Sequence, residues 1–403
     1  RDNERARRSQ SLVVELLRGE VGDTSHTQHS ELDDWCQKHQ VKSSRFGGRE
    51  QPIQDVSHPA IAVNLESCIQ CTRCVRACRE EQMNDVIGLA FRGAHSQIVF
   101  DLGDDMGASS CVGCGECVQA CPTGALMPSG DVGLEEIDRE VDSVCPYCGV
   151  GCLLKYHIKD NQIRYVTGRD GPANKGRLCV KGRYGFDYVS HPERLTKPMI
   201  RKEGIPKGLN EFFDPADPSK MFREASWEEA LDFAAAGLQE TRDTIGANGL
   251  AGFGSAKGSN EEAYLFQKLV RAGFGTNNVD HCTRLCHASS VAALLEGIGS
   301  GAVSNQVEDA AHADVIVVIG ANPTGNHPVA ATFIKNAARK GATLIVMDPR
   351  RTDLARHADY FLQFRADTDV ALLNAMIHTI IDEDLTDQAF IESRTRNFKE
   401  LQE

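Results

Sequence analysis

The chain contains Cys68-Ile-Gln-Cys71-Thr-Arg-Cys74-Val-Arg-Ala-Cys78 and, further on, Cys111-Val-Gly-Cys114-Gly-Glu-Cys117-Val-Gln-Ala-Cys121-Pro122. Both runs have the cysteine spacing C-x2-C-x2-C-x3-C, which is typical of proteins with two [4Fe-4S] clusters. Three closely spaced thiolates bind three irons of one cubane, and the fourth cysteine of each run reaches the other cluster. A disulfide framework or a pair of zinc ribbons is the alternative, and the repeated spacing disfavours both. The pattern predicts a protein that moves single electrons.

This crossover of the fourth cysteines assigns the ligands of two clusters. The first cluster is predicted to bind Cys68, Cys71, Cys74 and Cys121. The second is predicted to bind Cys78, Cys111, Cys114 and Cys117. A third run, Cys145-Pro-Tyr-Cys148-Gly-Val-Gly-Cys152, is followed by Cys179. Four thiolates again suffice for one [4Fe-4S] cluster, and a zinc site with four cysteines is the alternative.

Length and charge restrict the class of protein further. With 403 residues the chain has room for about two to four domains, and 41% apolar residues are ordinary for folded protein. A net charge of −13 argues against a nucleic-acid surface, because a phosphate backbone would repel it. No stretch approaches the roughly 18 consecutive apolar residues of a transmembrane helix, so no membrane span is expected. Cluster cysteines suit a reducing compartment, which favours the cytoplasm.

The pattern along the chain predicts four segments. They are an N-terminal helix and connector at 1–59, a ferredoxin-like domain with two [4Fe-4S] clusters at 60–135, a [4Fe-4S] domain at 141–200 and an α/β domain at 201–403. The helix is expected at the amphipathic run Ser11–Leu17, and a strand near residues 96–100 joins the two halves of the ferredoxin-like domain.

The connector also holds residue types that bind metals, namely His26, His29, Cys36 and His39. One thiol among polar residues without turn glycines is a poor template for a zinc site. We therefore expect these four to be ordinary surface residues.

The second half of the chain alternates between apolar strands and helices. Buried strands are predicted at 313–320 and 342–348 with a helix at 329–340 between them, and together they form a parallel βαβ unit. Ligands of such sheets bind at the loops after the carboxyl ends of the strands. Those loops are Gly320–Asn326 and Asp348–Arg351.

Two further cysteines, Cys282 and Cys286, lie between His281 and His287. If this segment is helical the two thiols share a face, and a structural or inert dithiol is then an alternative to a functional thiol. An adjacent imidazole and Arg284 would favour the thiolate, which is the form that binds metal or attacks a substrate. The spacing alone leaves both interpretations open.

Five strings, in this order, give the chain a wider resemblance. They are CPYCGVGC from Cys145, RLCVKGRYG from Arg177, CTRLCHASS from Cys282, GANPTGNHPVA from Gly320 and MDPRRTDLARHAD from Met347. Over residues 60–403 the chain resembles the molybdenum- or tungsten-dependent formate dehydrogenases, most closely the large subunit of the soluble NAD-dependent kind. The electron-transfer region of that subunit is similar to the large iron–sulfur subunit of respiratory NADH dehydrogenase.

The resemblance implies a metal held by two molybdopterin guanine dinucleotides. It implies that Cys286 binds molybdenum or tungsten directly, that His287 handles a proton, and that Lys181 lies between the third cluster and a pterin. Each expected cofactor contact, taken singly, could instead be a helix cap or a surface charge. The expected contacts are Lys181, Gly320, Asn322, Asp348, Arg350 and Asp369.

The resemblance also implies a reaction, a partner and a fold. Formate would be oxidised to carbon dioxide, or carbon dioxide reduced in reverse, and three [4Fe-4S] clusters would pass single electrons towards FMN and NAD on a flavin- and NAD-binding iron–sulfur subunit. The implied fold is multidomain, α/β and α+β. It comprises the ferredoxin-like domain, the [4Fe-4S] domain and a Rossmann-like parallel sheet of the molybdopterin oxidoreductase type.

Three other functions compete with formate oxidation. An electron-relay large subunit of an NADH dehydrogenase-like complex would need no pair such as Cys286 and His287. A nitrate reductase would also present a cysteine to molybdenum, but the histidine directly after it favours the formate type. In a non-catalytic electron-transfer or assembly protein, replacing Cys286 would change nothing.

The chain departs from the resembling family at both ends. Relatives often bind a further cluster with one histidine and three cysteines after the amphipathic helix, whereas only Cys36 is present here, so no cluster is expected between residues 1 and 60. Relatives can also carry a [2Fe-2S] domain upstream. The arginine that binds formate in relatives should lie beyond Glu403. We therefore expect the chain to be cut at both ends and inactive by itself.

Overall fold

The computed structural model describes residues 3–22, 30–49, 52–130, 136–208 and 211–403. The described chain separates into two compact units. The first consists of Arg1–Tyr184 and Gln306–Glu403, and the second of Gly185–Asn305. The residues expected as one α/β domain, 201–403, are therefore shared between the two units.

A pair of helices opens the first unit. Helix α1 (Glu4–Gly19) confirms the helix predicted from the amphipathic run, and α2 (Glu31–Lys38) packs against it. Val14, Leu32 and Cys36 form the buried centre of this pair. The prediction that Cys36 is an ordinary surface residue is wrong. Its side chain is only 7% exposed because it belongs to the face that α2 turns towards α1.

Of the other residues suggested for a metal site in the connector, the structure describes His39. His39 caps the carboxyl end of α2, its ring stacks on Trp35 at 5.8 Å between centroids, and its Nδ1 lies 3.3 Å from the Ser11 hydroxyl. His26 and His29 lie outside the described residues.

Two small antiparallel sheets support the paired cysteine runs. Strand β1 (Ile61–Val63) pairs with β4 (Leu126–Pro128). Strand β2 (Ile87–Ala90) pairs with β3 (Gln97–Phe100), which confirms the strand predicted near residues 96–100. The cysteine runs lie between these strands, so the sheets fix both ends of each run.

Short helices carry the third cysteine of each run. Helix α3 (Arg73–Arg76) contains Cys74, and α4 (Glu116–Ala120) contains Cys117. A π-helical turn over Ala77–Glu81 follows α3 and carries the fourth cysteine of the first run. Cysteines of both runs belong to the same buried cluster as the apolar core residues Ile61, Ile98, Met106 and Leu126.

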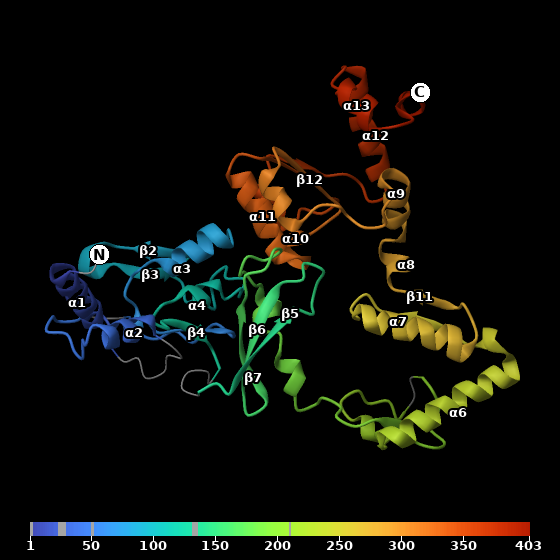
Figure 1. Ribbon diagram of the computed structural model, residues 1–403, viewed down its shortest axis with the longest axis horizontal. Coiled ribbons are helices and arrows are strands. Elements are labelled where there is room, and N and C mark those ends of the chain that lie inside the picture. The colour runs from blue at the N-terminus through green and yellow to red at the C-terminus, as the bar shows by residue number, and fades with distance from the viewer. Residues whose placement is uncertain (1–2, 23–29, 50–51, 131–135, 209–210) are drawn as a thin grey trace. The chain divides into compact units, whose positions relative to one another are not determined.

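A three-stranded antiparallel sheet follows in the first unit (Figure 1). Its strands are β5 (Arg139–Val144), β6 (Leu153–Lys159) and β7 (Gln162–Gly168). The third cysteine run connects β5 to β6, and helix α5 (Val180–Tyr184) begins directly after Cys179. The sheet therefore brings the run and the distant fourth cysteine to one end.

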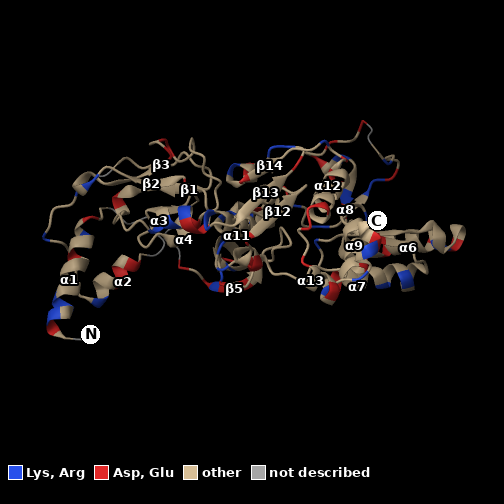
Figure 2. Ribbon diagram, turned by 90° about the horizontal axis from the view of Figure 1, so that it is seen from above, with Lys and Arg blue, Asp and Glu red and all other residues tan. Residues whose placement is uncertain are grey.

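The βαβ unit predicted from the sequence is confirmed. Strand β12 (Val315–Ile319) pairs in parallel with β13 (Thr343–Met347), and β14 (Tyr360–Leu362) adds a third parallel strand. Between the first two strands lie the short helix α10 (Pro323–Asn326) and α11 (Pro328–Arg339), which lies along the sheet in Figure 2. The loops after β12 and β13 emerge at the same edge, as the parallel order requires.

The prediction that β12 is a buried strand holds for only one of its faces. Ile316 and Val318 pack in the core beneath α11, whereas Val315 is 56% exposed and Val317 is 45% exposed. Side chains alternate between the faces of a strand, and the helix between β12 and β13 covers one of them. An all-apolar run therefore does not by itself show that both faces are covered.

Helix α11 joins the parallel sheet to the ferredoxin-like domain through a buried lysine. The ammonium group of Lys335 donates to the backbone oxygens of Gln82 at 2.6 Å and Met83 at 3.4 Å, and to the side-chain oxygen of Asn84 at 3.2 Å. Burial lowers the pKa of Lys335 to about 8. Arg339 adds a hydrogen bond to the Arg79 carbonyl at 3.0 Å.

The remaining elements belong to the end of the first unit and to the second unit. The first unit ends with α12 (Asp369–Asp382), α13 (Gln388–Arg394) and α14 (Phe398–Gln402). The second unit contains β8 (Met199–Arg201), β9 (Phe222–Glu224), α6 (Trp227–Ile245), β10 (Gly252–Gly254), α7 (Asn260–Lys268), β11 (Val279–His281), α8 (Thr283–Cys286) and α9 (Ala288–Ile298). Strands β10 and β11 are parallel neighbours. Among the described residues, no helix combines the length and the apolar character needed to cross a bilayer.

Replacing Leu344 by alanine should loosen the parallel sheet. Leu344 is fully buried at the centre of β13, and removing a buried leucine costs about 2–5 kcal/mol. Amide hydrogen exchange in β12–β14 should therefore accelerate, because the local opening free energy falls by that amount. Leu385→Ala is the matched control, since Leu385 is 63% exposed. Equal exchange in the two variants would contradict the packing described here.

Candidate functional site

The first unit gathers twelve cysteines into the three groups that the spacing predicts. Cys121, Cys68 and Cys71 all lie close enough to Cys74 to raise its thiol pKa, and we call these four residues the first thiol set. Cys117 is surrounded in the same way by Cys114, Cys111 and Cys78, and these four are the second thiol set. Cys152 has Cys145, Cys148 and Cys179 around it, and these four are the third thiol set. Cys74 also lies near Cys117, so the first two sets are neighbours.

Burial makes the ionised form of these thiols costly in the protein alone. Burial is the largest cause that raises the pKa of Cys74, Cys114 and Cys152 to about 12, and it also raises the pKa of Cys117 well above its ordinary value. Neighbouring thiols add to the effect. A thiolate is the form that binds iron, so each set needs the positive charge of bound metal to become ionised. The donor chemistry fits iron–sulfur clusters.

The backbone around the thiols is shaped for close approach to sulfur. The N–H groups of Gln70 and Gly113 each donate to a cysteine sulfur two residues earlier, at 3.3 Å. Gly113 and Gly115 have φ of +64° and +72°, a region that side-chain-bearing residues rarely adopt. All fifteen cysteines, each within the described residues, are free thiols, so the disulfide alternative does not describe this structure. Within the described ranges no three potential ligands converge on one metal ion; a cubane does not require this, because each thiolate binds its own iron.

A buried ion pair connects the second thiol set to the third. Glu116, between Cys114 and Cys117, accepts a hydrogen bond from the Leu178 N–H at 2.8 Å and one from Arg183 at 2.5 Å. Both side chains of the pair are almost completely buried. Arg183 also donates to the Cys114 carbonyl at 2.8 Å. Sequence reasoning missed this pair, because its partners are 67 residues apart.

A second contact holds the other backbone polar group of Leu178. The side-chain amide of Gln82 donates to the Leu178 carbonyl at 3.2 Å, while Glu116 accepts from the Leu178 N–H. Leu178 directly precedes Cys179. Gln82, which follows the first cysteine run, and Glu116, which lies within the second, therefore fix the position of Cys179. The geometry places the second and third sets on one rigid frame within the first unit.

Asn174 closes the loop that leads to Cys179. Its fully buried amide nitrogen lies 3.0–3.1 Å from the carbonyl oxygens of Leu153, Arg169 and Arg177, and its oxygen accepts from the Leu153 N–H at 3.1 Å. These bonds tie the fourth cysteine's loop to the strand that follows Cys152. No sequence signal singled out this asparagine.

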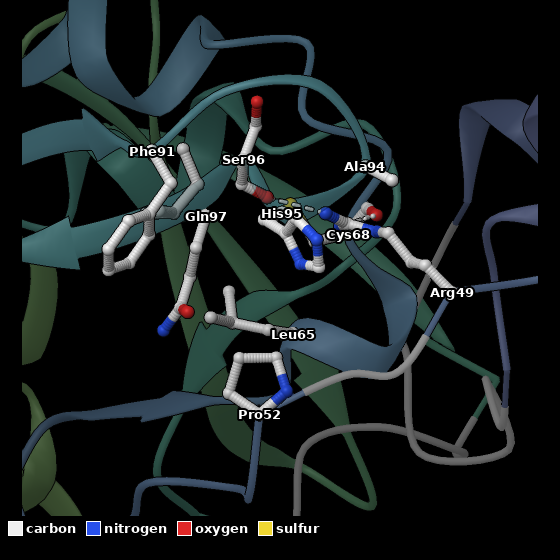
Figure 3. A pocket seen from close by; sticks show the side chains of 10 residues that line it. Arg49, Pro52, Leu65, Cys68, Phe91, Ala94, His95, Ser96 and Gln97 are labelled. Atoms are coloured by element: carbon white, nitrogen blue, oxygen red, sulfur yellow. Dashed lines mark hydrogen bonds between the residues drawn. The ribbon is translucent and has the colours of Figure 1, made fainter.

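A pocket of about 450 Å³ opens beside Cys68 (Figure 3). Arg49 reaches into it and donates to the Ser96 carbonyl at 2.6 Å and to the Cys68 carbonyl at 3.2 Å. The positive charge of Arg49 also favours ionisation of Cys68, against the larger opposing effect of burial. Arg49 therefore supplies a positive charge next to the first thiol set, which sequence reasoning did not anticipate.

Lys181 lies between the third thiol set and the loop after β12. Its ammonium group donates to the Gly325 carbonyl at 3.3 Å, and its charge also favours ionisation of Cys145. The next residue, Gly182, is so close to the third set that an added Cβ would lie 3.4 Å from the Cys145 sulfur. The expected role of Lys181 between the third cluster and a pterin stays a prediction.

The loops at the carboxyl edge of the parallel sheet are held by their own polar groups. Asp348 is buried and accepts a hydrogen bond from the Arg350 N–H at 2.7 Å, while the Arg350 side chain is exposed. Asn322 precedes α10 and accepts from the Thr324 hydroxyl at 2.8 Å. Gly320 has φ of +58° at the end of β12. These contacts order the loops.

Two other observations bear on the expected pterin contacts. Asp369 is the first residue of α12, directly after the N-cap Thr368, where the helix dipole favours a carboxylate. Thr352, directly after the loop Asp348–Arg351, has a buried hydroxyl that lacks a hydrogen-bond partner among the residues that the structure describes. An unpartnered buried hydroxyl at this edge fits a bound polar group, and sequence reasoning had not selected it.

Cys286 and His287 lie in the second unit. Helix α8 confirms that Cys282 and Cys286 occupy consecutive turns, with the Cys286 N–H donating to the Cys282 carbonyl at 3.2 Å. Both thiols are exposed, but the Cys282 sulfur accepts a hydrogen bond from the Ala256 N–H at 3.2 Å. Arg284, suggested as a partner for a thiolate, instead pairs with Asp280 at 2.8 Å.

Grouped thiols on a ferredoxin-like scaffold, beside a parallel sheet whose loops open at one edge, define an iron–sulfur oxidoreductase. Comparison with protein families makes this class specific. Residues 194–398 match the molybdopterin oxidoreductase model, 138–191 match the molybdopterin oxidoreductase Fe4S4 domain, and 58–127 match the ferredoxin-like domain of NADH-quinone oxidoreductase subunit 3. The chain belongs to the molybdopterin oxidoreductase family. Its mixed α/β fold contains ferredoxin-like and Fe4S4 domains followed by the molybdopterin oxidoreductase domain.

Several relatives carry formate dehydrogenase names. The chain is 41% identical over 264 residues to the F420-dependent formate dehydrogenase subunit alpha of Methanocaldococcus jannaschii, a match that covers 65% of this chain and 36% of that protein. It is 33% identical over 414 residues to a Staphylococcus aureus protein named "Putative formate dehydrogenase", covering 92% of this chain and 40% of that protein. The chain thus spans two fifths or less of the length of these relatives.

A solved structure supports the fold alone. Acetylene hydratase from Pelobacter acetylenicus aligns with a TM-score of 0.51 and 23% identity, covering 65% of this chain and 34% of the hydratase.

Replacing Asn174 by alanine should release the loop before Cys179. The variant loses all four side-chain contacts, each worth about 0.5–1.5 kcal/mol, and leaves buried carbonyl groups without their donor. Iron and acid-labile sulfide per chain should fall, and the unfolding midpoint should drop. Asn277→Ala is the matched control, because Asn277 is exposed and its φ is not positive. Unchanged iron and midpoint in the Asn174 variant would show that the loop does not depend on these bonds.

Proposed function

We propose that this chain is the cluster-bearing part of a formate dehydrogenase catalytic subunit of the soluble, NAD-linked type. The observation that carries the proposal is the pair Cys286 and His287, exposed in consecutive positions of a chain that belongs to the molybdopterin oxidoreductase family. The formate dehydrogenase names of its relatives support the same substrate. Reversal of the reaction would reduce carbon dioxide.

The proposal assigns a chemical role to residues of each unit, taken separately. A molybdenum or tungsten ion on two molybdopterin guanine dinucleotides would accept the two electrons released from formate. Cys286 is proposed as the protein ligand of that metal, and His287 as the group that holds or releases the proton. The loops Gly320–Asn326 and Asp348–Arg351 would hold the dinucleotides, with Asp369 as a further contact.

Electrons would leave through the thiol sets in reverse chain order. Each set is proposed to bind one [4Fe-4S] cluster, and Lys181 would help electrons pass from the pterin to the third set. The ion pair of Glu116 and Arg183 then connects the third set to the second, and Cys74 lies beside Cys117 at the step to the first. The two electrons from formate would in this way be transferred one at a time.

The electron acceptor is proposed to be an NADH dehydrogenase-like subunit that carries FMN and binds NAD. The match of residues 58–127 to a ferredoxin-like domain of NADH-quinone oxidoreductase supports this partner. Cys71 of the first thiol set is exposed, whereas Cys68 and Cys74 are buried, so this set lies at the surface where a partner would collect electrons. The name of the Methanocaldococcus relative gives F420 as the acceptor instead. If the intact complex reduced F420 but not NAD, the proposal of a flavin- and NAD-binding partner would be wrong.

Two other activities fit parts of the same chain. An electron-relay subunit of an NADH dehydrogenase-like complex would use the thiol sets but not Cys286. A nitrate reductase would use a metal-bound cysteine but a different substrate. Anaerobic electron paramagnetic resonance on the intact complex, with metal content from the same sample, separates them. Formate should produce reduced-cluster signals; reduction by NADH but not by formate would favour the relay.

Replacing Cys286 by serine should abolish formate oxidation. A serine hydroxyl is a harder donor than a thiolate and stays un-ionised near neutral pH, so the proposed metal would lose its protein ligand. Dithionite should still reduce the clusters, because the three thiol sets are untouched. The matched control is Cys282→Ser in the neighbouring turn, which should retain turnover. Formate turnover in the Cys286 variant would contradict the proposal.

A further inference from the structure

Tyr184, the last residue of α5, has a buried hydroxyl without a partner. Its oxygen is shielded from solvent, and no donor or acceptor among the described residues lies within hydrogen-bonding reach. Leaving a buried hydroxyl unpaired costs about 1–3 kcal/mol, so such groups in folded proteins nearly always have a partner. The observation therefore points to an acceptor that the polypeptide does not itself supply.

The surroundings of this hydroxyl identify the acceptor. The oxygen lies against Gly115, where an added Cβ would be 2.6 Å away. Gly115 stands between two members of the second thiol set, Cys114 and Cys117. Both of these thiols, together with Cys111, lie near enough to oppose ionisation of the phenol. The tyrosine ring also packs on the buried cluster that contains cysteines of this set.

The neighbouring arginine fixes the tyrosine in place. Arg183 is held by Glu116 and by the carbonyl of Cys114, and its own N–H donates to the Cys179 carbonyl at 3.0 Å. An added Cβ on Gly115 would lie 2.0 Å from the Arg183 side chain, so the two residues already fill the space above that glycine. The chain around Tyr184 is thus attached to both the second and the third thiol set.

We propose that the Tyr184 hydroxyl donates a hydrogen bond to a sulfur of the cluster bound by the second thiol set, and so raises the reduction potential of that cluster. The inference rests on the proposed function, in which this set binds a [4Fe-4S] cluster. Hydrogen bonds to cluster sulfurs stabilise the more negative reduced state, which makes the cluster easier to reduce. Tyr184 would thereby favour the step from the third cluster to the second.

Tyr184→Phe in the intact complex tests the proposal, because it removes one oxygen and keeps the ring. An electron paramagnetic resonance-monitored redox titration should show one [4Fe-4S] potential shifted to a more negative value, with the same iron per chain. Tyr188→Phe is the matched control, since Tyr188 is exposed and four residues away. Its potentials should equal those of the native complex. Unchanged potentials in the Tyr184 variant would overturn the proposal, as would a buried water serving as the acceptor.

A second measurement distinguishes a hydrogen bond from a packing role. Tyr184→3-fluorotyrosine keeps the ring and strengthens the donor, so the same potential should shift in the positive direction. Loss of packing alone cannot shift the potential in opposite directions in the two variants. Shifts of the same sign in both would contradict the hydrogen bond. If the native complex held no cluster at the second set, the proposed function itself would fail, and iron analysis of the native protein reports that separately.

Discussion

The cost of burying thiolates shapes the first unit. Four sulfur atoms brought together away from water resist ionisation, as the raised thiol pKa values of Cys74, Cys114 and Cys152 show. Iron relieves that cost, so the folded arrangement and metal binding depend on each other. The small sheets, the short helices and the glycines with positive φ all serve to bring sulfur atoms close without placing side chains in the space that a cluster needs.

The second constraint is that neighbouring thiol sets must keep a fixed separation. Three buried polar side chains near the sets meet this need. Glu116 and Gln82 hold the backbone N–H and the backbone carbonyl of Leu178, and Lys335 attaches α11 to the carbonyl groups that follow the first cysteine run. Because each of these groups is buried, an alternative arrangement would leave a charge or a carbonyl unpaired. This energetic cost keeps the thiol sets at fixed positions relative to one another.

The sequence predicts local features of this structure well. Cysteine spacing is enough to group the thiols, because three of the four ligands of each set lie within a short run. The βαβ unit follows from apolar periodicity. Pairs such as Glu116 and Arg183 could not be predicted, because nothing within either segment shows that they meet. The predictions of burial for Cys36 and for the exposed face of β12 are wrong for the same reason, because the burial of a side chain depends on which other segment covers it.

The crossover between the paired cysteine runs has a consequence for how the protein matures. Each of the first two sets borrows its fourth sulfur from the other half of the ferredoxin-like domain: Cys121 completes one, and Cys78 completes the other. Neither set has its four ligands until both halves have folded against each other. A cluster therefore cannot be completed in one set while the other half of the domain is still unfolded. A single proteolytic cut between the halves, followed by their separation, would strip one ligand from both sets at once.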